Sequence, residues 1–354
     1  MRKLLVLSDG RSIHTERWCR YFEQNGFEVG LFSLEEISIS SPKIKYQGRR
    51  PTGRGIIDYS LAKNQFRKIA ESFNPDIINA HFVNSYGWLA SHTDNCPVVV
   101  TAWGTDLLIL PQKSQIQRRR VARALGHAHT CTVDSQNLFD AANEFIEERK
   151  IENIIMGVDR GFFENRVKKD YRKKEIIRIL APRGFQAVYD PESIIKAADA
   201  LKGEYKFQID MSGDDSSIRK YGMMINKLNL TEMISLKQRL PREEFEKSLL
   251  GYDVYLSSSL SDSTSVALLE AMSVGLLPIV SDIPGNREWI TDSYNGYLFE
   301  PGNVASLTEK LMEVLNGEID ITHIAQINRS LIEEKAIWQD NMLKLKNLFL
   351  KIAQ

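Results

Sequence analysis

Short apolar runs alternate with longer amphipathic segments along the whole chain. The runs lie at 4–8, 29–33, 76–80, 97–102, 130–133, 153–156, 177–181, 207–212, 233–237, 253–258, 277–281 and 296–299. Helical spacing of apolar residues occupies much of the sequence between them, for example at 14–25, 59–73, 85–93, 115–126 and 136–148. The runs are apolar throughout rather than at every second position, which is typical of parallel strands covered on both faces. The pattern therefore predicts doubly wound α/β structure.

This alternation passes through two rounds, separated by the charged stretch "RVKKDYRKKE" at 166–175. A chain of 354 residues also exceeds the usual size of one domain. We expect an N-terminal domain over 1–160, a linker over 161–175 and a C-terminal domain over 176–325. The remainder, 326–354, is amphipathic and is expected to form a helix that packs back on the N-terminal domain.

Composition narrows the class of protein further. Lys and Arg total 46, as do Asp and Glu, so no overall charge attracts nucleic acid or an anionic membrane. The three cysteines lack C-x-x-C spacing and are expected to be free thiols. The first apolar run ends at Ser8, short of a signal-peptide core, and no apolar stretch reaches the ~18 residues of a membrane span. We expect a cytoplasmic protein, at most peripheral on a membrane.

One local charge pattern points to such a peripheral contact. The segment 112–125 carries Arg118, Arg119, Arg120 and Arg123 beside apolar residues at helical spacing. That helix could rest on anionic lipid and present a lipid-linked acceptor. A solvated helix face explains the same pattern equally well.

Two common nucleotide-binding motifs, the dinucleotide fingerprint and the P-loop, are missing from the sequence. "SDGRSIHTERWC" contains only Gly10 where a dinucleotide fingerprint needs G-x-G-x-x-G, and no P-loop motif occurs in the chain. The missing glycines weigh against a dehydrogenase, and the missing P-loop motif excludes a P-loop kinase or ATPase. Gly10 still permits an anion to approach a helix start, although a tight turn alone would also explain it.

The segment "SLSDSTSVALLEAM" carries the strongest chemical signal. Hydroxyls and free backbone N–H groups gather at a probable helix start, where the helix dipole favours a phosphate. Glu270 follows about two turns later on an apolar helix and needs hydrogen-bond donors, such as ribose hydroxyls. Arg183, in "LAPRGFQAVYD", suits a diphosphate, although it could be an ordinary surface arginine. Together these features suggest a nucleotide.

Several segments, taken in order, resemble the retaining glycosyltransferases of family 4. They are "SIHTERWCRYFEQNGFEV", "VVVTAWGTDLL", "IIMGVDRGFF", "ILAPRGF", "FQIDMSGDD", "RLPREEFEKSLLGYDVYLSSS" and "DSTSVALLEAM", and they span nearly the whole chain. The last is similar to the family's E-x7-E motif, here D-x7-E. The resemblance implies the GT-B fold, in which two Rossmann-like domains face a central cleft.

The resemblance also implies a reaction. A sugar would move from a nucleotide diphosphate-sugar to a glycan, polysaccharide or lipid-linked acceptor, with its anomeric configuration retained. Uridine is expected because it is the family's commonest base. In the same-face mechanism usually ascribed to the family, the leaving phosphate accepts the acceptor's proton, so no metal and no cofactor are expected. The alternatives are a GT-B-fold nucleotide-sugar epimerase or phosphorylase, or a nucleotide-sugar-binding protein with little turnover.

Site residues follow from the same resemblance. Glu270 would hold the donor ribose, and Asp262 would stand where the family's first Glu touches the donor sugar. The remaining donor-side positions are Arg183 and Gly184 at the diphosphate, Thr264, Ser265 and Val266 at the distal phosphate, Gly10 at an anion, and Gly213, Arg239, Leu240 and Pro241 near the base. Asp106, Arg11 and His14 would face the acceptor. His81 could line the cleft or merely end a strand.

Three positions depart from the family pattern. Asp262 is one methylene shorter than the Glu it replaces, Trp103 stands where the family has His, and Tyr189 stands where it has Lys. Trp103 is expected to form a stacking wall for a sugar, although it could simply cap the sheet. The changes at Trp103 and Tyr189 are also what a binding protein with little turnover would show.

Overall fold

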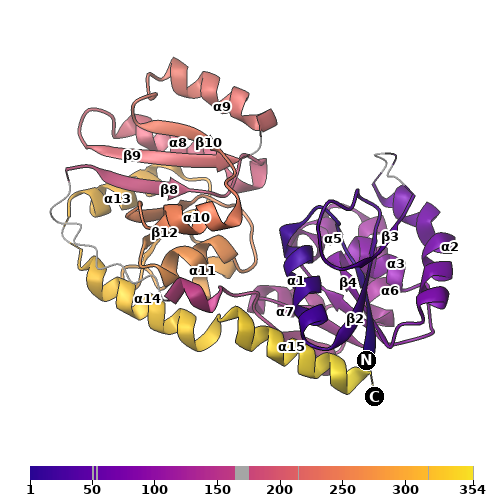
Figure 1. Ribbon diagram of the computed structural model, residues 1–354. Coiled ribbons are helices and arrows are strands. Elements are labelled where there is room, and N and C mark those ends of the chain that lie inside the picture. Colours follow the sequence, from indigo (N-terminus) through magenta and orange to yellow (C-terminus); the bar gives the residue numbers. More distant parts are fainter. Residues whose placement is uncertain (50–51, 53–54, 164–174, 214, 318, 354) are drawn as a thin grey trace. The chain divides into compact units, whose positions relative to one another are not determined.

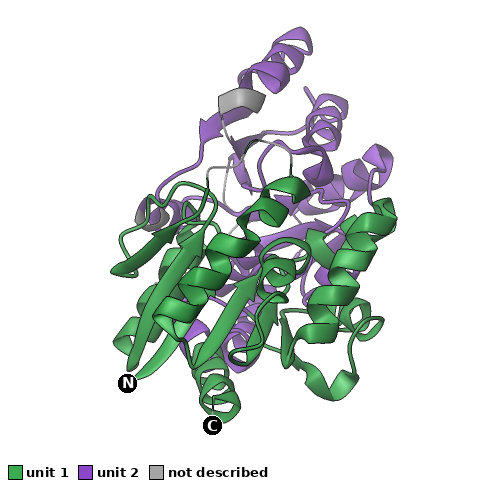
Figure 2. Cartoon of the chain, turned by 90° about the vertical axis from the view of Figure 1, so that its right-hand side faces the viewer, with its two compact units in different colours: residues 1–155, 341–354 green, residues 156–340 purple. Residues whose placement is uncertain are grey.

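The computed structural model describes residues 1–49, 52, 55–163, 175–213, 215–317 and 319–353. Most of the expected linker, 164–174, lies outside these residues. The chain divides into two compact units, shown in different colours in Figure 2. Unit 1 comprises Met1–Ile155 and Asn341–Gln354, and unit 2 comprises Met156–Asp340.

Unit 1 is built on a parallel sheet in the order β3-β2-β1-β4-β5-β6-β7. Its strands are β1 (Arg2–Leu7), β2 (Phe27–Ser33), β3 (Ile44–Gln47), β4 (Ile77–His81), β5 (Val98–Thr101), β6 (Thr130–Val133) and β7 (Ile151–Asn153). The chain order reverses at β1, between β2 and β4, which makes this the switch point where ligands of such sheets bind. The sequence pattern missed β3, because this short edge strand, "IKYQ", is only partly buried and carries no apolar run.

Helices follow most strands of unit 1, as Figure 1 shows. They are α1 (Ile13–Gln24), α2 (Ile56–Phe73), the π-helix η1 (Phe82–Gly87), α3 (Trp88–Ala90), α4 (Thr105–Leu108), α5 (Leu110–Lys113), α6 (Gln115–His127), α7 (Gln136–Asn143) and the 3-10 turn η2 (Glu148–Lys150). Ser12 and Ser135 cap α1 and α7 by accepting backbone N–H groups. The helix expected over 85–93 is instead the end of a π-helix followed by the single turn of α3.

Unit 2 repeats the design with the order β10-β9-β8-β11-β12-β13, again all parallel. Its strands are β8 (Ile177–Ala181), β9 (Phe207–Gly213), β10 (Ile234–Gln238), β11 (Val254–Ser257), β12 (Leu277–Ser281) and β13 (Tyr297–Phe299). Here the order reverses at β8, between β9 and β11. The prediction of two Rossmann-like units with parallel sheets is therefore confirmed.

The helices of unit 2 complete its two layers around the sheet (Figure 1). They are η3 (Arg160–Phe163), η5 (Ala187–Tyr189), α8 (Pro191–Ala200), α9 (Asp215–Lys227), α10 (Arg242–Leu249), α11 (Val266–Ser273), α12 (Pro284–Arg287), α13 (Val304–Leu315) and α14 (Ile321–Lys335). Among the described residues, none of the helices combines the length and apolar character that a bilayer crossing requires.

Residues 326–354 contain the end of α14 and a separate helix, α15 (Trp338–Ile352). The chain extends between them because Val158 pairs with it: the Val158 N–H donates to Ala336 O (2.8 Å), and the Trp338 N–H donates to Val158 O (2.7 Å). Gly157 permits this approach, since a Cβ there would lie 2.4 Å from Ala336 O. From Asn341 onward α15 belongs to unit 1, where Phe349 is fully buried.

Phe349 contributes to the core of unit 1 through a ring contact. Its ring stacks on Phe22 of α1, with the two centroids 5.0 Å apart and an interplanar angle of 13°. Truncating a buried Phe to Ala costs about 3–5 kcal/mol because transfer and cavity costs add. We therefore expect Phe349→Ala to lower the free energy of unfolding of unit 1 by that amount in urea titrations.

Leu343, which is 50% exposed on the same helix, provides the matched control. Leu343→Ala should change the free energy of unfolding by no more than about 0.5 kcal/mol. Equal effects of the two substitutions would show that α15 does not pack on unit 1 through Phe349.

Candidate functional site

The loops after β8 and β11 meet at the switch point of unit 2. Arg183 follows β8 and Asp262 follows β11, and the Arg183 Nη2 donates to the Asp262 Oδ2 in an ion pair. Both side chains are largely buried, with 20% and 16% exposed. Burial raises the pKa of the Asp262 carboxyl, and the charge of Arg183 opposes that shift. Two residues far apart in sequence are thus paired where a ligand of this sheet is expected.

The start of α11 lies directly after this pair. Ser265 is its N-cap, and its Oγ accepts the N–H of Leu268 (3.3 Å). Thr264 is buried, and its Oγ1 accepts the Nε1–H of Trp289 (3.4 Å). The first backbone N–H groups of a helix have no intrahelical acceptor, so the stretch from Thr264 to Val266 suits an anion. Glu270, on the same helix, is 3% exposed.

The other expected donor-side residues of unit 2 gather at the ends of β8, β9 and β10. Gly184 has φ +84°, a backbone conformation that favours glycine, and a Cβ there would lie 3.8 Å from Arg239 Nη2. Gly213, at the end of β9, faces the Phe185 ring so closely that a Cβ would lie 2.2 Å from it. Leu240 and Pro241 follow Arg239 and are exposed. The structure thus brings Gly184, Gly213 and Arg239 to the same edge of the sheet.

Gly285 in α12 supports the site, although its role could not be predicted from the sequence. A Cβ there would lie 2.3 Å from Ser263 O and 2.8 Å from Asp262 O, so the helix packs directly on the backbone that carries Asp262. The only sequence signal is a Pro-Gly pair, which ordinarily indicates a turn.

The switch point of unit 1 contains a buried hydrogen-bonded chain around His81. The His81 Nδ1 lies 3.1 Å from Ser8 Oγ, and its Nε2 lies 3.1 Å from Asn79 Oδ1. Since the Asn79 amide donates to Thr101 Oγ1 (2.9 Å), its oxygen is free to accept from His81. Burial lowers the pKa of His81 to about 3, so the ring is neutral at physiological pH. His81 therefore ends β4 as a buried structural link.

Trp103 lies in an aromatic cluster after β5. Its ring centroid is 5.3 Å from His81, 5.6 Å from His14 and 5.7 Å from Phe82, whose ring is nearly parallel to it at 22°. Phe82 has φ +63°, a strained conformation for a bulky residue. Such strain is most common at functional sites, and sequence reasoning had not singled out Phe82.

Asp106 fixes the backbone beside this aromatic cluster. It is fully buried, and its Oδ1 and Oδ2 accept the backbone N–H groups of Trp103 (3.1 Å) and Val83 (2.8 Å). Burial raises the pKa of this carboxyl, while the backbone donors oppose the shift. Asp106 thus joins the loops after β4 and β5, and its contacts are those of a positioning residue.

In the loop after β1, two of the predicted site residues, Gly10 and Arg11, make contacts within the protein. A Cβ on Gly10 would lie 2.8 Å from Ile37 Cγ1, so packing against Ile37 already requires glycine there. Arg11 is exposed and forms a two-point pair with Asp9, with Nε to Oδ1 at 3.0 Å and Nη2 to Oδ2 at 2.8 Å. Arg11 is therefore oriented by its neighbour.

Three of the four arginines of α6 contact other residues of the protein. The contacts are Arg118 with Glu144 (3.3 Å), Arg120 Nε with Asn84 O (2.9 Å), and Arg123 Nε with Ser91 Oγ (3.1 Å). Arg120 is buried and its guanidinium lies 3.6 Å from the Trp88 ring centre. Arg119 and Ile116 remain exposed. Arg118 is thus paired with a carboxylate and Arg120 is buried, while Arg119 and Arg123 keep their positive charge at the surface.

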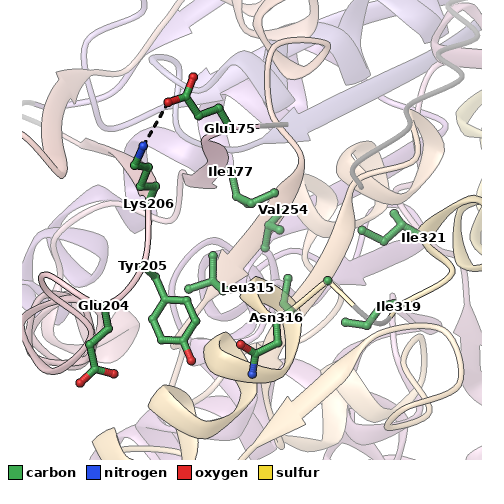
Figure 3. A pocket seen from close by; sticks show the side chains of 12 residues that line it. Glu175, Ile177, Glu204, Tyr205, Lys206, Val254, Leu315, Asn316, Ile319 and Ile321 are labelled. Atoms are coloured by element: carbon green, nitrogen blue, oxygen red, sulfur yellow. Dashed lines mark hydrogen bonds and ion pairs between the residues drawn. The ribbon is translucent and has the colours of Figure 1, made fainter. Parts of the chain in front are cut away.

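A separate cavity of about 430 Å³ lies at the amino-terminal ends of β8, β9 and β11, and Figure 3 shows its lining. Ile177, Tyr205, Val254 and Asn316 are among its walls, and Glu175 pairs with Lys206 at 3.0 Å. Its lining includes none of the candidate site residues, and it lies away from the carboxyl ends of the strands. We therefore place the functional site at the Arg183–Asp262 pair. Within the described ranges, no group of His, Cys, Asp or Glu side chains is arranged to hold a metal ion.

The buried, neutral His81 has a consequence for stability. Between the usual pKa near 6.5 and about 3, the unfolded chain binds a proton that the folded state excludes, so stability rises with pH. This group should lower the free energy of unfolding by roughly 1.4 kcal/mol per pH unit below about pH 6. Urea titrations at pH 7, 6 and 5 should show the free energy of unfolding falling as the pH falls, and His81→Gln should reduce the slope by about this amount.

His323→Gln, on the exposed surface of α14, is the control and should keep the wild-type slope. An unchanged slope in His81→Gln would contradict a neutral His81.

The close packing of Gly285 on the backbone of Asp262 and Ser263 can also be tested. A methyl group at this position would displace the carbonyls of Asp262 and Ser263, so Gly285→Ala should destabilise unit 2 by about 1–3 kcal/mol. Gly222→Ala in α9 is the control, because a Cβ there meets only Leu236 Cδ1 at 3.8 Å. Thermal unfolding should separate the two variants, and equal melting temperatures would refute the contact.

Two family models match successive parts of the chain. The one described as "Glycosyl transferase 4-like" matches residues 3–135, and the one described as "Glycosyl transferases group 1" matches residues 162–331. An uncharacterized glycosyltransferase of Methanocaldococcus jannaschii is 23% identical over 97% of this chain and 95% of that protein. The matches therefore extend over both units.

Solved structures share the fold at low sequence identity. Sucrose-phosphate synthase from Thermosynechococcus elongatus superposes with a TM-score of 0.84 at 13% identity, covering 99% of each chain. The Anabaena protein HepE in complex with UDP gives a TM-score of 0.77 at 14% identity, covering 99% of this chain and 100% of its own. Since both units match glycosyltransferase models and the fold is that of GT-B enzymes, the chain is a glycosyltransferase of the GT-B type.

Proposed function

We propose that this glycosyltransferase takes a sugar from a UDP-sugar and transfers it with retention to a glycan or polysaccharide acceptor, as a member of family 4 with a D-x7-E motif. The observation that carries the proposal is the buried Arg183–Asp262 pair beside the start of α11. Positive charge, the backbone N–H groups of a helix start and two carboxylates occur together there. The UDP named for the Anabaena relative supports the choice of base.

The proposed mechanism depends on the charge that develops on the leaving diphosphate. As the glycosidic bond breaks, Arg183 and the N–H groups of Thr264, Ser265 and Val266 stabilise the phosphate oxygens. These donors belong to short, packed loops, so little reorganisation is needed during the reaction. Asp262 exchanges its contact with Arg183 for a hydroxyl of the donor sugar, and Glu270 accepts hydrogen bonds from the ribose. The leaving phosphate accepts the acceptor's proton, and the reaction proceeds without metal.

Unit 1 would receive the acceptor. The Trp103 and Phe82 rings, with His14 beside them, supply the apolar faces that sugar rings pack against, and Arg11 with Asp9 supplies polar groups nearby in sequence. Asp106 and His81 would act indirectly, by fixing the backbone and the ring cluster. Because most arginines of α6 have partners within the protein, a membrane contact through 112–125 forms no part of the proposal.

Glu270→Ala tests the donor site. Transfer should fall by at least roughly 100-fold, because the ribose would lose its anchor and the reacting bond its alignment. Released UDP is measured after incubation with a panel of UDP-sugars, and the anomeric signal of the product reports retention. Glu192→Ala, on α8 and paired with Lys196 (2.8 Å), is the control and should keep wild-type activity.

Full activity of Glu270→Ala would refute the assignment, and an inverted product would refute retention. A C2-epimerised sugar, or binding without UDP release, would instead indicate the epimerase or the binding protein. Glu270→Gln, which preserves the shape of the side chain, distinguishes loss of folding from loss of function.

A further inference from the structure

We infer that Tyr189 is a positioning residue that holds Arg183 ready for the leaving diphosphate, an inference that rests on the proposed function. The Arg183 Cζ lies 4.7 Å from the centre of the Tyr189 ring, while its Nη2 donates to Asp262. The guanidinium is therefore held at one edge by a carboxylate and at one face by a ring. Its buried Nε has no hydrogen-bond partner among the described residues.

The backbone keeps Tyr189 and Asp262 on the two sides of Arg183. The Ser258 Oγ, just after β11, lies 2.8 Å from Tyr189 O and from Asp190 O, and its single hydroxyl hydrogen is donated to this pair of carbonyls. The Leu260 N–H donates to Val188 O, also at 2.8 Å. The turn that carries Tyr189 is thus fastened to the segment that leads to Asp262, so the backbone of Tyr189 cannot move away without breaking these hydrogen bonds.

An aromatic ring suits this task better than a second carboxylate would. The negative face of the ring attracts a guanidinium without neutralising its charge, so Arg183 remains able to bind phosphate oxygens. A carboxylate at position 189 would compete with the diphosphate for the Arg183 guanidinium. The Tyr189 ring instead keeps the guanidinium oriented from one face. The edge of the guanidinium that contacts Asp262 can then bind the phosphate oxygens in its place. Holding a long side chain in place before binding also reduces the entropy lost when the ligand arrives.

The test compares Tyr189→Leu with Tyr189→Phe, using UDP and UMP as probes in calorimetric titrations. Tyr189→Leu should weaken UDP binding by roughly 3- to 30-fold, the range of a partly desolvated cation–π contact. Tyr189→Phe keeps the ring and should bind UDP within about twofold of wild type. UMP lacks the distal phosphate, so Tyr189→Leu should weaken its binding much less than that of UDP.

Tyr297→Leu is the matched control, because Lys310 Nζ lies 5.6 Å from that ring in the same unit and away from the site. It should leave the affinities for UDP and UMP unchanged. Equal loss of UDP and UMP binding in Tyr189→Leu would overturn the inference, since that pattern indicates a disturbed loop. Wild-type affinity in Tyr189→Leu, or failure of Tyr189→Phe to restore UDP binding, would also overturn it.

Two outcomes separate the inference from the proposed function. If wild type binds UDP and releases it from a UDP-sugar while Tyr189→Leu behaves as wild type, only the inference fails. If wild type neither binds UDP nor releases it from any donor, the proposed function fails, and the role of Tyr189 fails with it.

Discussion

All the strands of each sheet run in one direction, so the loops that follow them collect at a single edge. In unit 2 this brings Arg183, after β8, against Asp262, after β11, although they are far apart in the sequence. In unit 1 the same constraint gathers Ser8, His81 and Trp103 from the ends of three strands. Parallel pairing alone therefore determines where both candidate sites lie, whichever side chains occupy them.

Burial then decides which of the polar groups carry charge. Arg183 and Asp262 are largely buried but paired, so each offsets the cost of removing the other from water. Asp106 instead accepts the backbone N–H groups of Val83 and Trp103, while His81 remains neutral. Asp106 and His81 therefore hold neighbouring loops and strand ends of unit 1 in place. The paired cation in unit 2 retains its charge, which the proposed contact with a phosphate requires.

Close backbone contacts fix the geometry around the proposed donor site. Gly285 lets α12 rest on the carbonyls of Asp262 and Ser263, and Gly213 lets the Phe185 ring lie against the end of β9. The hydrogen bonds from Ser258 join the turn of Tyr189 to the strand that leads to Asp262. A departure such as Tyr189 is then explained by its neighbours, because its ring contacts the very guanidinium that would bind a diphosphate.

The sequence by itself determined the two doubly wound units, since apolar runs and amphipathic segments report local periodicity and burial. It also determined the start of α11, because the Ser265 cap and the apolar residues after it are neighbours in the chain. Only the tertiary structure decided that β3 forms an edge, that Arg118, Arg120 and Arg123 contact other residues of unit 1, and that Phe82 packs on Trp103. It also decided what Tyr189 and Gly285 touch, namely the Arg183 guanidinium and the backbone of Asp262 and Ser263. These features depend on contacts between residues distant in sequence, and without an alignment a single sequence carries no record of which residues those are.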